Sequence, residues 1–353
     1  MSQYNIIGLM SGTSLDGLDI VCCQFIKHKS TWKYNVLACD TIGYSSSWID
    51  TLPNLMHASA HELIKIDTIY GDFLGQCVND FINKYNLKVD LIASHGHTIF
   101  HMPQEKYGFQ IGKGEAIYAL TSIPVIYDFR ALDIALGGQG APLVPIGDLY
   151  LFSEYSFCLN LGGIANISEK TQQGIIAYDI CPCNMVLNYL ANKINLAYDE
   201  SGKIASSGNI IPSLVNELNQ LSFYKKKHPK SLGREWVEEI FIPLLESFKL
   251  PIEDYMASCV EHIAIQISLC LASSKNKKVL ITGGGVFHTL LIQRIEHYAK
   301  NITVVVPSKE IINYKEAIIF AFLGVLKVEK EINCLSSVTG AIKDSSSGKV
   351  IGI

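Results

Sequence analysis

The sequence predicts an α/β protein of two lobes that face each other across a cleft. A pattern of three strands followed by helices occurs twice along the 353 residues, and both copies place a glycine-rich turn after the first strand. Hydrophobic residues make up 48% of the chain, which is enough to build a large core. Ligands of α/β sheets bind beyond the strand ends, so we expect the glycine turns to line the site.

The first copy begins with three apolar segments that are separated by turn residues, as in consecutive strands. A capping box of Ser59 and Glu62 then predicts a helix over Leu63 to Tyr85, because the serine accepts from the first turn. The strands that we expect in this copy are NIIGLM (5–10), LDIVCCQF (18–25), WKYNVLACDTIG (32–43), VDLIAS (89–94) and IPVIYDF (123–129).

The second copy repeats this plan, with helical patterns from about residue 184 and a last helix from Lys315 to Val328. We therefore expect one lobe over 1–133 and about 316–353, and the other over 134–315, with LGGQGAP (136–142) as the crossing. The expected strands are YSFCLNL (155–161), IANIS (164–168), GIIAYDI (174–180), the start of VLITGGGVF (279–287), and ITVVVP (302–307).

Composition narrows the class of protein. The net charge of −4 argues against a nucleic-acid partner, which favours a basic face. The start of the chain lacks a signal-peptide pattern, and the longest apolar run, Ala317 to Leu326, is too short to span a membrane. The ten cysteines are scattered, which is typical of reduced thiols. We expect a cytoplasmic protein without a membrane partner.

The opening turn, GLMSGTSLDGLD (8–19), has the composition of an anion site. Glycines let backbone N–H groups converge on an anion, and Ser11, Thr13 and Ser14 add hydroxyl donors. Asp16 and Asp19 would repel phosphate but are suited to holding Mg²⁺ through its waters. A plain hairpin uses the same residues, so this alternative stays open.

Two further glycine turns follow strands, at Gly162 and Gly163 and at Gly283 to Gly285. Each signal is weak alone. Three such turns in one chain, two of them related by the duplication, indicate a nucleotide that is held between the lobes.

Three charged residues at strand or helix ends are candidates for chemistry. Asp179 ends a strand, where a carboxylate either faces the cleft or caps the next helix. Arg130 lies at a similar edge and either binds an anion or forms a salt bridge between the lobes. Glu316 reads as an ordinary acid in the first turn of the last helix.

The segment SHGHTIFHMP (94–103) places His95, His97 and His101 at alternating positions. An extended strand would turn all three to one face. Such a strip suits a sugar contact or the support of a turn, and zinc binding is a second possibility.

These motifs in this order resemble the anhydro-N-acetylmuramic acid kinases over nearly the whole chain. The GGQGAPLVP run and the opening hairpin are the most specific of them. The matching segments are GLMSGTSLDGLD, SHGHTIFHMP, FQIGKGEAIY, IPVIYDFR, GGQGAPLVPIGD, NLGGIANIS, YDICPCN, PKSLGRE, TGGGVFHTLL, KEAIIFAFLG and SVTGA.

The resemblance implies an actin-like, hexokinase-type fold with a duplicated βββαβα core, and it implies ATP and Mg²⁺ as cofactors. Asp16 and Asp19 would hold the Mg²⁺ through water. The nucleotide would be bound by Ser11, Gly12, Thr13, Ser14, Leu15, Asp16, Gly17, Leu18, Asp19, Gly162, Gly163, Gly283, Gly284 and Gly285.

The resemblance also implies the reaction. The enzyme would hydrolyse the anhydro bridge of 1,6-anhydro-N-acetylmuramic acid, a product of cell-wall turnover, and phosphorylate O6 to give N-acetylmuramic acid 6-phosphate. Asp179 would be the general base, because water needs a positioned carboxylate to take its proton. Thr98, Arg130, Glu316 and His97 would contact the sugar. A homodimer is expected on the same ground.

The chain departs from the family pattern at two places. Many members read DTGPGN where residues 179–184 are DICPCN, and SHGQT where this chain has His97. Cysteine adopts a positive φ less easily than glycine, so the turn at Cys181 and Cys183 is expected to differ in shape. Two alternatives stay open: a kinase of another amino sugar on the same fold, and a non-catalytic sensor of nucleotide or muropeptide.

Overall fold

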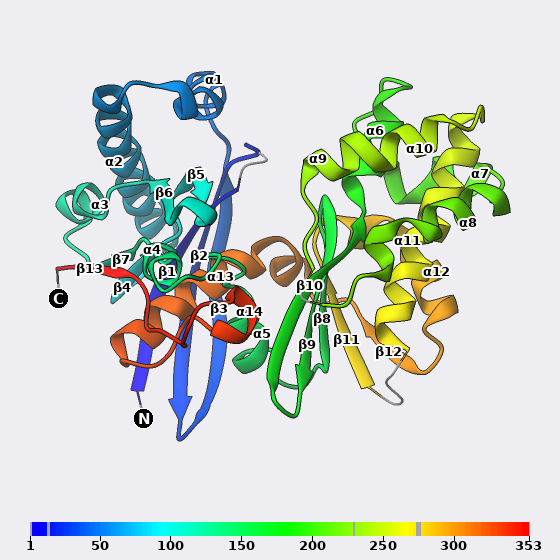
Figure 1. Cartoon of the computed structure of the whole chain (residues 1–353). Helices are drawn as coiled ribbons and strands as arrows, with labels where there is room; N and C mark the ends of the chain where they lie inside the picture. Colours follow the sequence, from blue (N-terminus) through cyan, green and yellow to red (C-terminus); the bar gives the residue numbers. More distant parts are fainter. Residues whose placement is uncertain (1, 13–14, 229, 273–276, 353) are drawn as a thin grey trace. The chain divides into compact units, whose positions relative to one another are not determined.

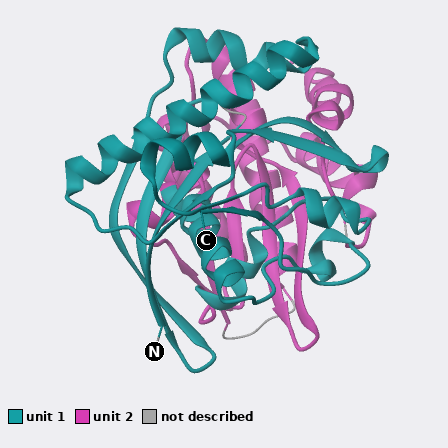
Figure 2. Cartoon of the chain, turned by 90° about the vertical axis from the view of Figure 1, so that its left-hand side faces the viewer, with its two compact units in different colours: residues 1–151, 314–353 teal, residues 152–313 magenta. Residues whose placement is uncertain are grey.

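The computed structural model describes residues 2–12, 15–228, 230–272 and 277–352. The chain divides into two compact units, Met1–Leu151 with Tyr314–Ile353, and Phe152–Asn313 (Figure 2). We expected the boundary at residue 133, but 134–151 belong to the first unit. The cause is α5 (Pro145–Tyr150), which packs on α13 (Lys309–Val328): a side chain at Gly147 would lie 2.4 Å from Ile319, and Asp148 pairs with Lys315 at 2.7 Å.

The described residues of the first unit form a six-stranded sheet in the order β13-β7-β4-β1-β2-β3 (Figure 1). β1 pairs antiparallel with β2, and β2 with β3, whereas β1, β4 and β7 run parallel. The strands are β1 (Ser2–Ser11), β2 (Leu18–His28), β3 (Thr31–Ile42), β4 (Leu91–Ser94), β7 (Val125–Tyr127) and β13 (Lys349–Ile351), with β5 (His97–Met102) and β6 (Tyr107–Ile111) in a separate two-stranded sheet.

Helices cover both faces of this sheet. Ile7 and Leu9 of β1 share a core with Tyr70 and Leu74 of α2. Gly8, between them, faces the other way, where an added Cβ would lie 2.1 Å from the carbonyl oxygen of Ala317 in α13. The other helices of this unit are α1 (Ser46–Asn54), α2 (Ala60–Tyr85), α3 (Gly114–Thr121), α4 (Ala131–Ala135) and α14 (Ser336–Thr339), with short helices η1 (Leu55–His57) and η2 (Pro103–Glu105).

The described residues of the second unit form a five-stranded sheet in the order β10-β9-β8-β11-β12. β8, β9 and β10 are antiparallel neighbours, and β8, β11 and β12 run parallel. The strands are β8 (Phe157–Leu161), β9 (Ile164–Thr171), β10 (Gly174–Pro182), β11 (Lys277–Thr282) and β12 (Ile302–Val305). Order and direction match those of β3-β2-β1-β4-β7, so the predicted duplication is confirmed.

The core of the second unit is centred on α11, whose buried residues pack with β8, β9 and β10. The helices are α6 (Asn184–Asn192), α7 (Lys203–Ser207), α8 (Pro212–Gln220), α9 (Arg234–Trp236), α10 (Ile242–Glu246), α11 (Ile252–Leu271) and α12 (Thr289–Tyr298), with short helices η3 (Glu200–Gly202), η4 (Ser222–Lys225), η5 (Val237–Phe241) and η6 (Gly284–Phe287).

The helix boundaries test the sequence signals. Ser59 caps α2 as predicted, with its Oγ accepting from the Glu62 N–H at 3.2 Å. The last long helix begins at Lys309, six residues before the predicted Lys315. Glu316 therefore lies in its second turn, and the prediction of a first-turn acid was wrong because Glu310 occupies that place.

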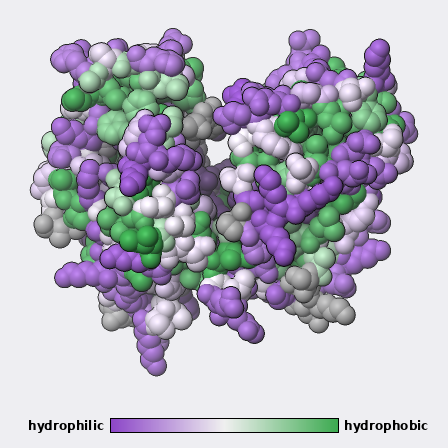
Figure 3. Space-filling model, viewed as in Figure 1, coloured by the Kyte–Doolittle hydropathy of each residue, from purple (hydrophilic) through white to green (hydrophobic). Residues whose placement is uncertain are grey.

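The surface mixes polar and apolar side chains. The face shown in Figure 3 has hydrophilic areas that are interrupted by smaller hydrophobic ones on each unit. Among the helices that the structure describes, none is both long and apolar enough to cross a membrane.

Candidate active site

Gly17, which directly precedes β2, is held by close packing on β3. Leu15 has a φ of 61°, and Gly17 has a φ of 150°. A Cβ at Gly17 would lie 2.7 Å from the carbonyl oxygen of Ile42 on β3, so no other residue fits there without movement. Thr13 and Ser14, which we predicted to bind the nucleotide, lie outside the described residues.

A buried hydrogen-bonded chain fixes the end of β1. The Oγ of Ser11 lies 2.6 Å from the hydroxyl of Tyr44 and 2.7 Å from Nδ1 of His97. The hydroxyls of Tyr44 and Tyr70 are 2.6 Å apart. Burial lowers the pKa of His97 to about 4, so its ring is neutral at neutral pH. Two predicted site residues, Ser11 and His97, are thus brought together.

Carboxylates gather beside this turn. The pKa of Asp19 is raised to about 6: burial is the main cause, the charges of Asp16 and Glu316 add to it, and a hydrogen bond from Thr41 (2.7 Å) opposes them. Desolvation also raises the pKa of Glu316, against the charges of Arg130 and Lys315. Three predicted site residues therefore form one acidic group, and its like charges disfavour the ionised state.

This acidic group has the chemistry of a divalent-cation site. Oxygen ligands from carboxylates are what Mg²⁺ prefers, and a cation would offset the repulsion that raises the pKa of Asp19. The residues present therefore fit the predicted ion, with Asp16 and Asp19 as the candidates to hold it. Of the described residues, no group of three His, Cys, Asp or Glu has ready-made metal-ligand geometry.

Arg130 is held by a histidine and a loop carbonyl. Its Nε and Nη2 lie 3.1 and 2.8 Å from Nε2 of His95, and its Nη1 donates to the carbonyl of Gly140 at 2.6 Å. The Nε2 of His95 must therefore accept, which leaves the ring proton on Nδ1 to donate to the carbonyl of Gly96 (2.8 Å). Burial and the charge of Arg130 lower the pKa of His95, in keeping with a neutral ring. These partners belong to the first unit, so the alternative of a salt bridge between lobes finds no support in them.

The three histidines of SHGHTIFHMP do not share one face, and that expectation was wrong. His95 precedes β5, and Gly96, with a φ of 72°, turns the chain before His97 begins the strand. A register shift between Thr98 and Phe100 then alters the alternation, and His101 is exposed. Thr98, a predicted sugar contact, is half-buried and lies opposite Gln110 on β6.

The second unit brings its two glycine turns together. The N–H groups of Cys183 and Asn184, at the start of α6, donate to the carbonyls of Gly163 (2.8 Å) and Gly162 (3.1 Å). The Asn184 Nδ2 donates to the carbonyl of Leu161 at 2.9 Å. A Cβ at Gly285 would lie 2.7 Å from the side chain of Leu161, so η6 packs directly on the end of β8.

Some of these glycines meet little of the protein itself. A Cβ at Gly163 would be 3.7 Å from Met185, and a Cβ at Gly284 would be 3.7 Å from Asn184. Packing explains Gly283, whose Cβ would lie 2.5 Å from Oδ1 of Asn160, but it does not explain the other two. Both glycines are exposed, and bare backbone that packing does not require fits close approach by a ligand such as a nucleotide.

Asp179 lies on β10 and is bonded to a loop. Its Oδ2 accepts from the Ser231 hydroxyl at 2.9 Å and from the Leu232 N–H at 2.8 Å. Burial raises the pKa of Asp179, while these two donors lower it. The helix-cap alternative is wrong, because the N-cap of α6 is Cys183 and no side chain caps that helix.

The two cysteines of the DICPCN turn both have a negative φ. Cys181 continues β10, paired with Ala165 after a bulge, and Cys183 has a φ of −130°. Neither needs the positive φ that glycine allows, which explains how cysteine is accepted here. Both side chains are buried, and burial raises the pKa of each thiol.

Sequence reasoning missed the residues that hold the candidates in place. His95 was noticed only as one member of the histidine strip, and not as the partner of Arg130. Ser231 and Leu232 lie in PKSLGRE, a segment that resembles the family pattern but to whose residues the sequence assigned no role. No local pattern reports contacts across 52 or 35 residues, such as Ser231 with Asp179 or His95 with Arg130.

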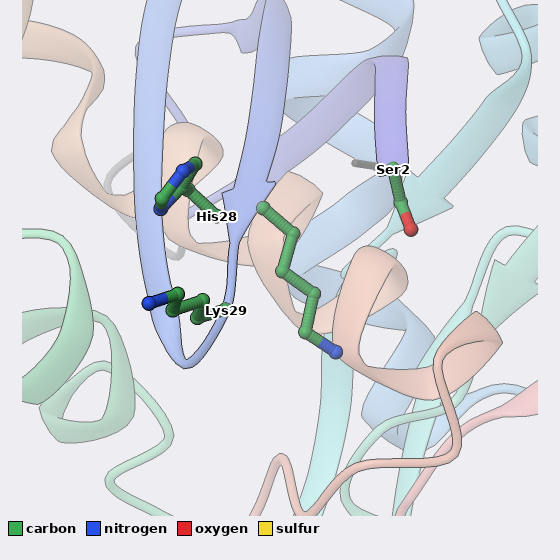
Figure 4. Close-up of a pocket in the computed structure, with 4 residues that line it drawn as sticks. Ser2, His28 and Lys29 are labelled. Atoms are coloured by element: carbon green, nitrogen blue, oxygen red, sulfur yellow. The ribbon is translucent and has the colours of Figure 1, made fainter.

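A surface pocket of about 430 Å³ lies elsewhere in the first unit, lined by Ser2, Lys27, His28 and Lys29 (Figure 4). Ser2 and Ser11 are the two ends of β1, roughly 30 Å apart at the usual rise of a strand. Lys27 is paired with Glu329 and Glu331. This pocket is therefore remote from the acidic group, and we assign it no part in the chemistry.

The repeated strand order, with a glycine-bearing turn after the first strand of each sheet, confirms the duplicated α/β architecture that the sequence predicts. Among solved structures, the chain is similar to component A of (R)-2-hydroxyglutaryl-CoA dehydratase from Acidaminococcus fermentans, at 11% identity over 92% of this chain and 99% of that one, with a TM-score of 0.47. It is also similar to the activator of 2-hydroxyisocaproyl-CoA dehydratase from Clostridium difficile, at 14% identity over 92% and 96% of the chains, with a TM-score of 0.45.

The family model for anhydro-N-acetylmuramic acid kinase matches residues 4–352, and the chain belongs to this family. It is 33% identical to the anhydro-N-acetylmuramic acid kinase of Pseudoalteromonas translucida over 82% of this chain and 80% of that protein. Its identity to the kinases of Sulfurimonas denitrificans and Coxiella burnetii is 30% and 32%, over 99% of this chain and 100% and 98% of theirs. The chain is therefore an enzyme of the phosphotransferase class, and membership of a kinase family implies the use of ATP.

Proposed function

We propose that the chain hydrolyses the anhydro bridge of 1,6-anhydro-N-acetylmuramic acid and phosphorylates O6 with ATP, giving N-acetylmuramic acid 6-phosphate and ADP. The family match over residues 4–352 supports the activity. The single structural observation that supports the mechanism is the state of the Asp179 carboxylate. It is half-buried, its pKa is raised, and among the described residues it accepts hydrogen bonds through Oδ2 only.

Asp179 is the general base in this proposal. Its carboxylate takes a proton from water, whose oxygen bonds to the anomeric carbon as the bond from that carbon to O6 breaks. The anomeric carbon gains oxocarbenium character, and the electron pair of the broken bond stays on O6. O6 then attacks the γ-phosphoryl group of ATP, and ADP leaves. A pKa raised by burial makes the carboxylate a stronger proton acceptor.

Residues of the first unit orient the sugar. Arg130 is held rigidly by His95 and Gly140, so its remaining N–H groups are pre-organised donors. Thr98 and the neutral His97 lie on the adjoining strand β5, and Glu316 is electrostatically linked to Arg130. Positioning of this kind supplies much of the rate enhancement in phosphoryl transfer.

The three glycine turns bind the nucleotide in this proposal, and Asp16 and Asp19 hold Mg²⁺ through water. When bound, Mg²⁺ supplies neutralisation of phosphate charge. The support for this assignment is the exposed backbone of Gly163 and Gly284, where packing does not require glycine, and the crowding of carboxylates around Asp19.

Two expectations concern the setting of the enzyme. The homodimer and the cytoplasmic location rest on the resemblance to the family and on composition. Light scattering of the purified chain tests the first, and a monomer mass would reject it.

The test of the function uses purified protein, ATP, Mg²⁺ and the anhydro sugar in ¹⁸O-labelled water, followed by mass spectrometry. We expect a phosphorylated product with one heavy oxygen at C1. Asp179→Asn should lower kcat by roughly 10³-fold, within the range for loss of a general base. The matched control is Asp254→Asn, which removes a carboxylate of the same unit that accepts from the Asn209 N–H at 2.7 Å.

Each outcome separates the parts of the proposal. Product without heavy oxygen would exclude attack by water at C1. Normal turnover by Asp179→Asn would keep the kinase and reject this base. Phosphorylation of a different amino sugar in preference to the anhydro sugar would favour the alternative kinase.

A further inference from the structure

The loop Lys230–Leu232 runs along the outer edge of β10. β10 is the edge strand of its sheet, so the backbone at Asp179 has no strand neighbour on that side. The loop takes this place: the N–H of Asp179 donates to the carbonyl of Lys230 at 3.0 Å. The backbone of Asp179 is therefore bonded to Lys230, and its side chain is bonded to Ser231 and Leu232 of the same loop.

The two side-chain bonds converge on one oxygen. The Ser231 hydroxyl and the Leu232 N–H both donate to Oδ2, and Oδ1 accepts no hydrogen bond from any residue that the structure describes. Two donors on one carboxylate oxygen fix the rotation of the carboxylate plane. The other oxygen keeps its lone pairs in a defined direction.

The backbone of β10 is irregular at this residue. The register with β9 shifts between Asp179 and Cys181, as in a β-bulge. Bulges at sheet edges re-aim a side chain. The bulge and the loop are independent features, and both act on the direction of the same carboxylate.

We propose that Ser231 is a positioning residue that holds the carboxylate of Asp179 through Oδ2 and so presents Oδ1 as the atom that accepts the proton from water. This inference rests on the proposed function of Asp179 as the base. Ser231 itself takes no proton in the reaction.

The hydrogen bond also bears on the charge of Asp179. A donor to the ionised carboxylate favours that form, so Ser231 opposes the effect of burial on the pKa. The titratable groups nearby are Tyr178 and Cys181 on β10 and His228 and Lys230 on the loop. Burial raises the pKa of Tyr178 and of Cys181, so both stay neutral. The ring of His228 stacks on that of Tyr178 with centroids 5.3 Å apart, and Nζ of Lys230 lies 4.6 Å from the ring centroid of Phe223.

The test compares Ser231→Ala with Ser231→Thr, which keeps the hydroxyl. A hydrogen bond to a charged group contributes enough that its loss should lower kcat about tenfold, with KM for the anhydro sugar changed less than about twofold. The acid limb of kcat/KM should move up by roughly one pH unit, because the alanine variant loses a donor to the ionised carboxylate. Ser231→Thr should stay within about threefold of the unaltered enzyme.

Two control variants and a melting curve complete the design. Ser247→Ala removes a hydroxyl of the same unit that donates to the carbonyl of Leu244 at 2.7 Å, and it should leave the kinetics unchanged. His228→Gln should leave the acid limb in place. Circular dichroism should show the same melting for Ser231→Ala and the unaltered protein, which excludes misfolding as the cause.

Three results would overturn the inference. The first is an acid limb and a kcat for Ser231→Ala that match the unaltered enzyme. The second is a rise in KM alone, which would make Ser231 a sugar contact. The third is full turnover by Asp179→Asn. That last result refutes the proposed function of Asp179 itself, and it is distinguishable because it does not involve Ser231.

Discussion

The turn between β1 and β2 and the turn between β8 and β9 hold the same position in two sheets of the same strand order. Their chemistry differs. The first turn carries Asp16, and the start of β2 carries Asp19, whose pKa is raised by the charge of Glu316. The second consists of Gly162 and Gly163, whose carbonyls are occupied by the N–H groups that begin α6.

Under the proposed function, the duplicated frame is divided between two tasks. The first unit collects ionisable side chains, which suits a metal ion and a polar sugar. The second offers bare backbone and one oriented carboxylate, Asp179, which suits a nucleotide and an attacking water. The strand frame sets where a turn lies, and the residues in the turn decide what it binds.

After the loss expected for Asp179→Asn, the next largest effect is expected at Asp19, in the unit whose turn is rich in charge. Asp19→Asn should lower kcat by about 100-fold or more if this carboxylate holds Mg²⁺, since loss of electrostatic stabilisation has this size. The same change should raise the melting temperature of the ligand-free protein by about 2–4 °C at pH 7.5. The reason is that the folded pKa of about 6 lies above the value of 3.8 in the unfolded chain, so ionised Asp19 destabilises the fold above pH 6.

The gain in stability should vanish at pH 4, where Asp19 is protonated in the folded protein. Asp50→Asn, an exposed aspartate of the same unit, is the control and should change neither property. An Asp19→Asn variant that keeps full activity would show that Asp19 does not hold the Mg²⁺ needed for the reaction.

The next effect concerns the support of Arg130. His95→Phe keeps an aromatic ring against Phe320, whose centroid is 4.7 Å away, but removes the nitrogen that accepts from Arg130. We expect kcat/KM for the sugar to fall about tenfold, because a donor that is no longer pre-organised loses part of its binding energy. Arg130→Lys should give a loss of similar or larger size.

A double-mutant cycle tests whether these two residues act as one. The combined variant should lose little more than Arg130→Lys alone, since both changes break the same contact. Additive losses would mean that His95 does not act through Arg130. The first unit would then not owe its sugar binding to an Arg130 side chain that His95 holds in place.

Local sequence patterns predicted the strands of both sheets and the start of α2, because these features depend on neighbouring residues. Alternating or continuous apolar runs gave the strands of both copies, and Ser59 marked the start of α2 because a capping hydroxyl satisfies N–H groups of the first turn. The errors lie where distant residues meet. The chain from Pro145 to Tyr150 joined the first unit through a buried pair with Lys315, which no local pattern reports.

The candidate site was predictable as a set of residues but not as an arrangement. Asp179 and Arg130 were chosen because local pattern placed them at strand ends, but β10 continues to Pro182 and β7 already ends at Tyr127. Their partners, Ser231 and His95, are fixed by loop paths and by a single positive φ at Gly96. Side-chain alternation also failed at Thr98 and Phe100, because a bulge changes the period of two on which it depends.

The smallest expected effect compares one buried histidine in each unit. Burial lowers the pKa of His97 to about 4 and that of His262 to about 3, against 6.5 in the unfolded chain. Protonation therefore favours unfolding, so each histidine should lower the free energy of unfolding as pH falls below about 6.5. For His97 the loss at pH 5 is on the order of 1–2 kcal/mol.

His97→Gln and His262→Gln should each reduce the drop in melting temperature between pH 7 and pH 5, measured by circular dichroism. His61→Gln, at an exposed position on α2, is the control and should leave that drop unchanged. Glutamine at position 97 is what many relatives carry, so this variant should also keep its activity. An equal acid sensitivity in all three variants would place the titrating groups elsewhere, and the carboxylates of the first unit would be the next to test.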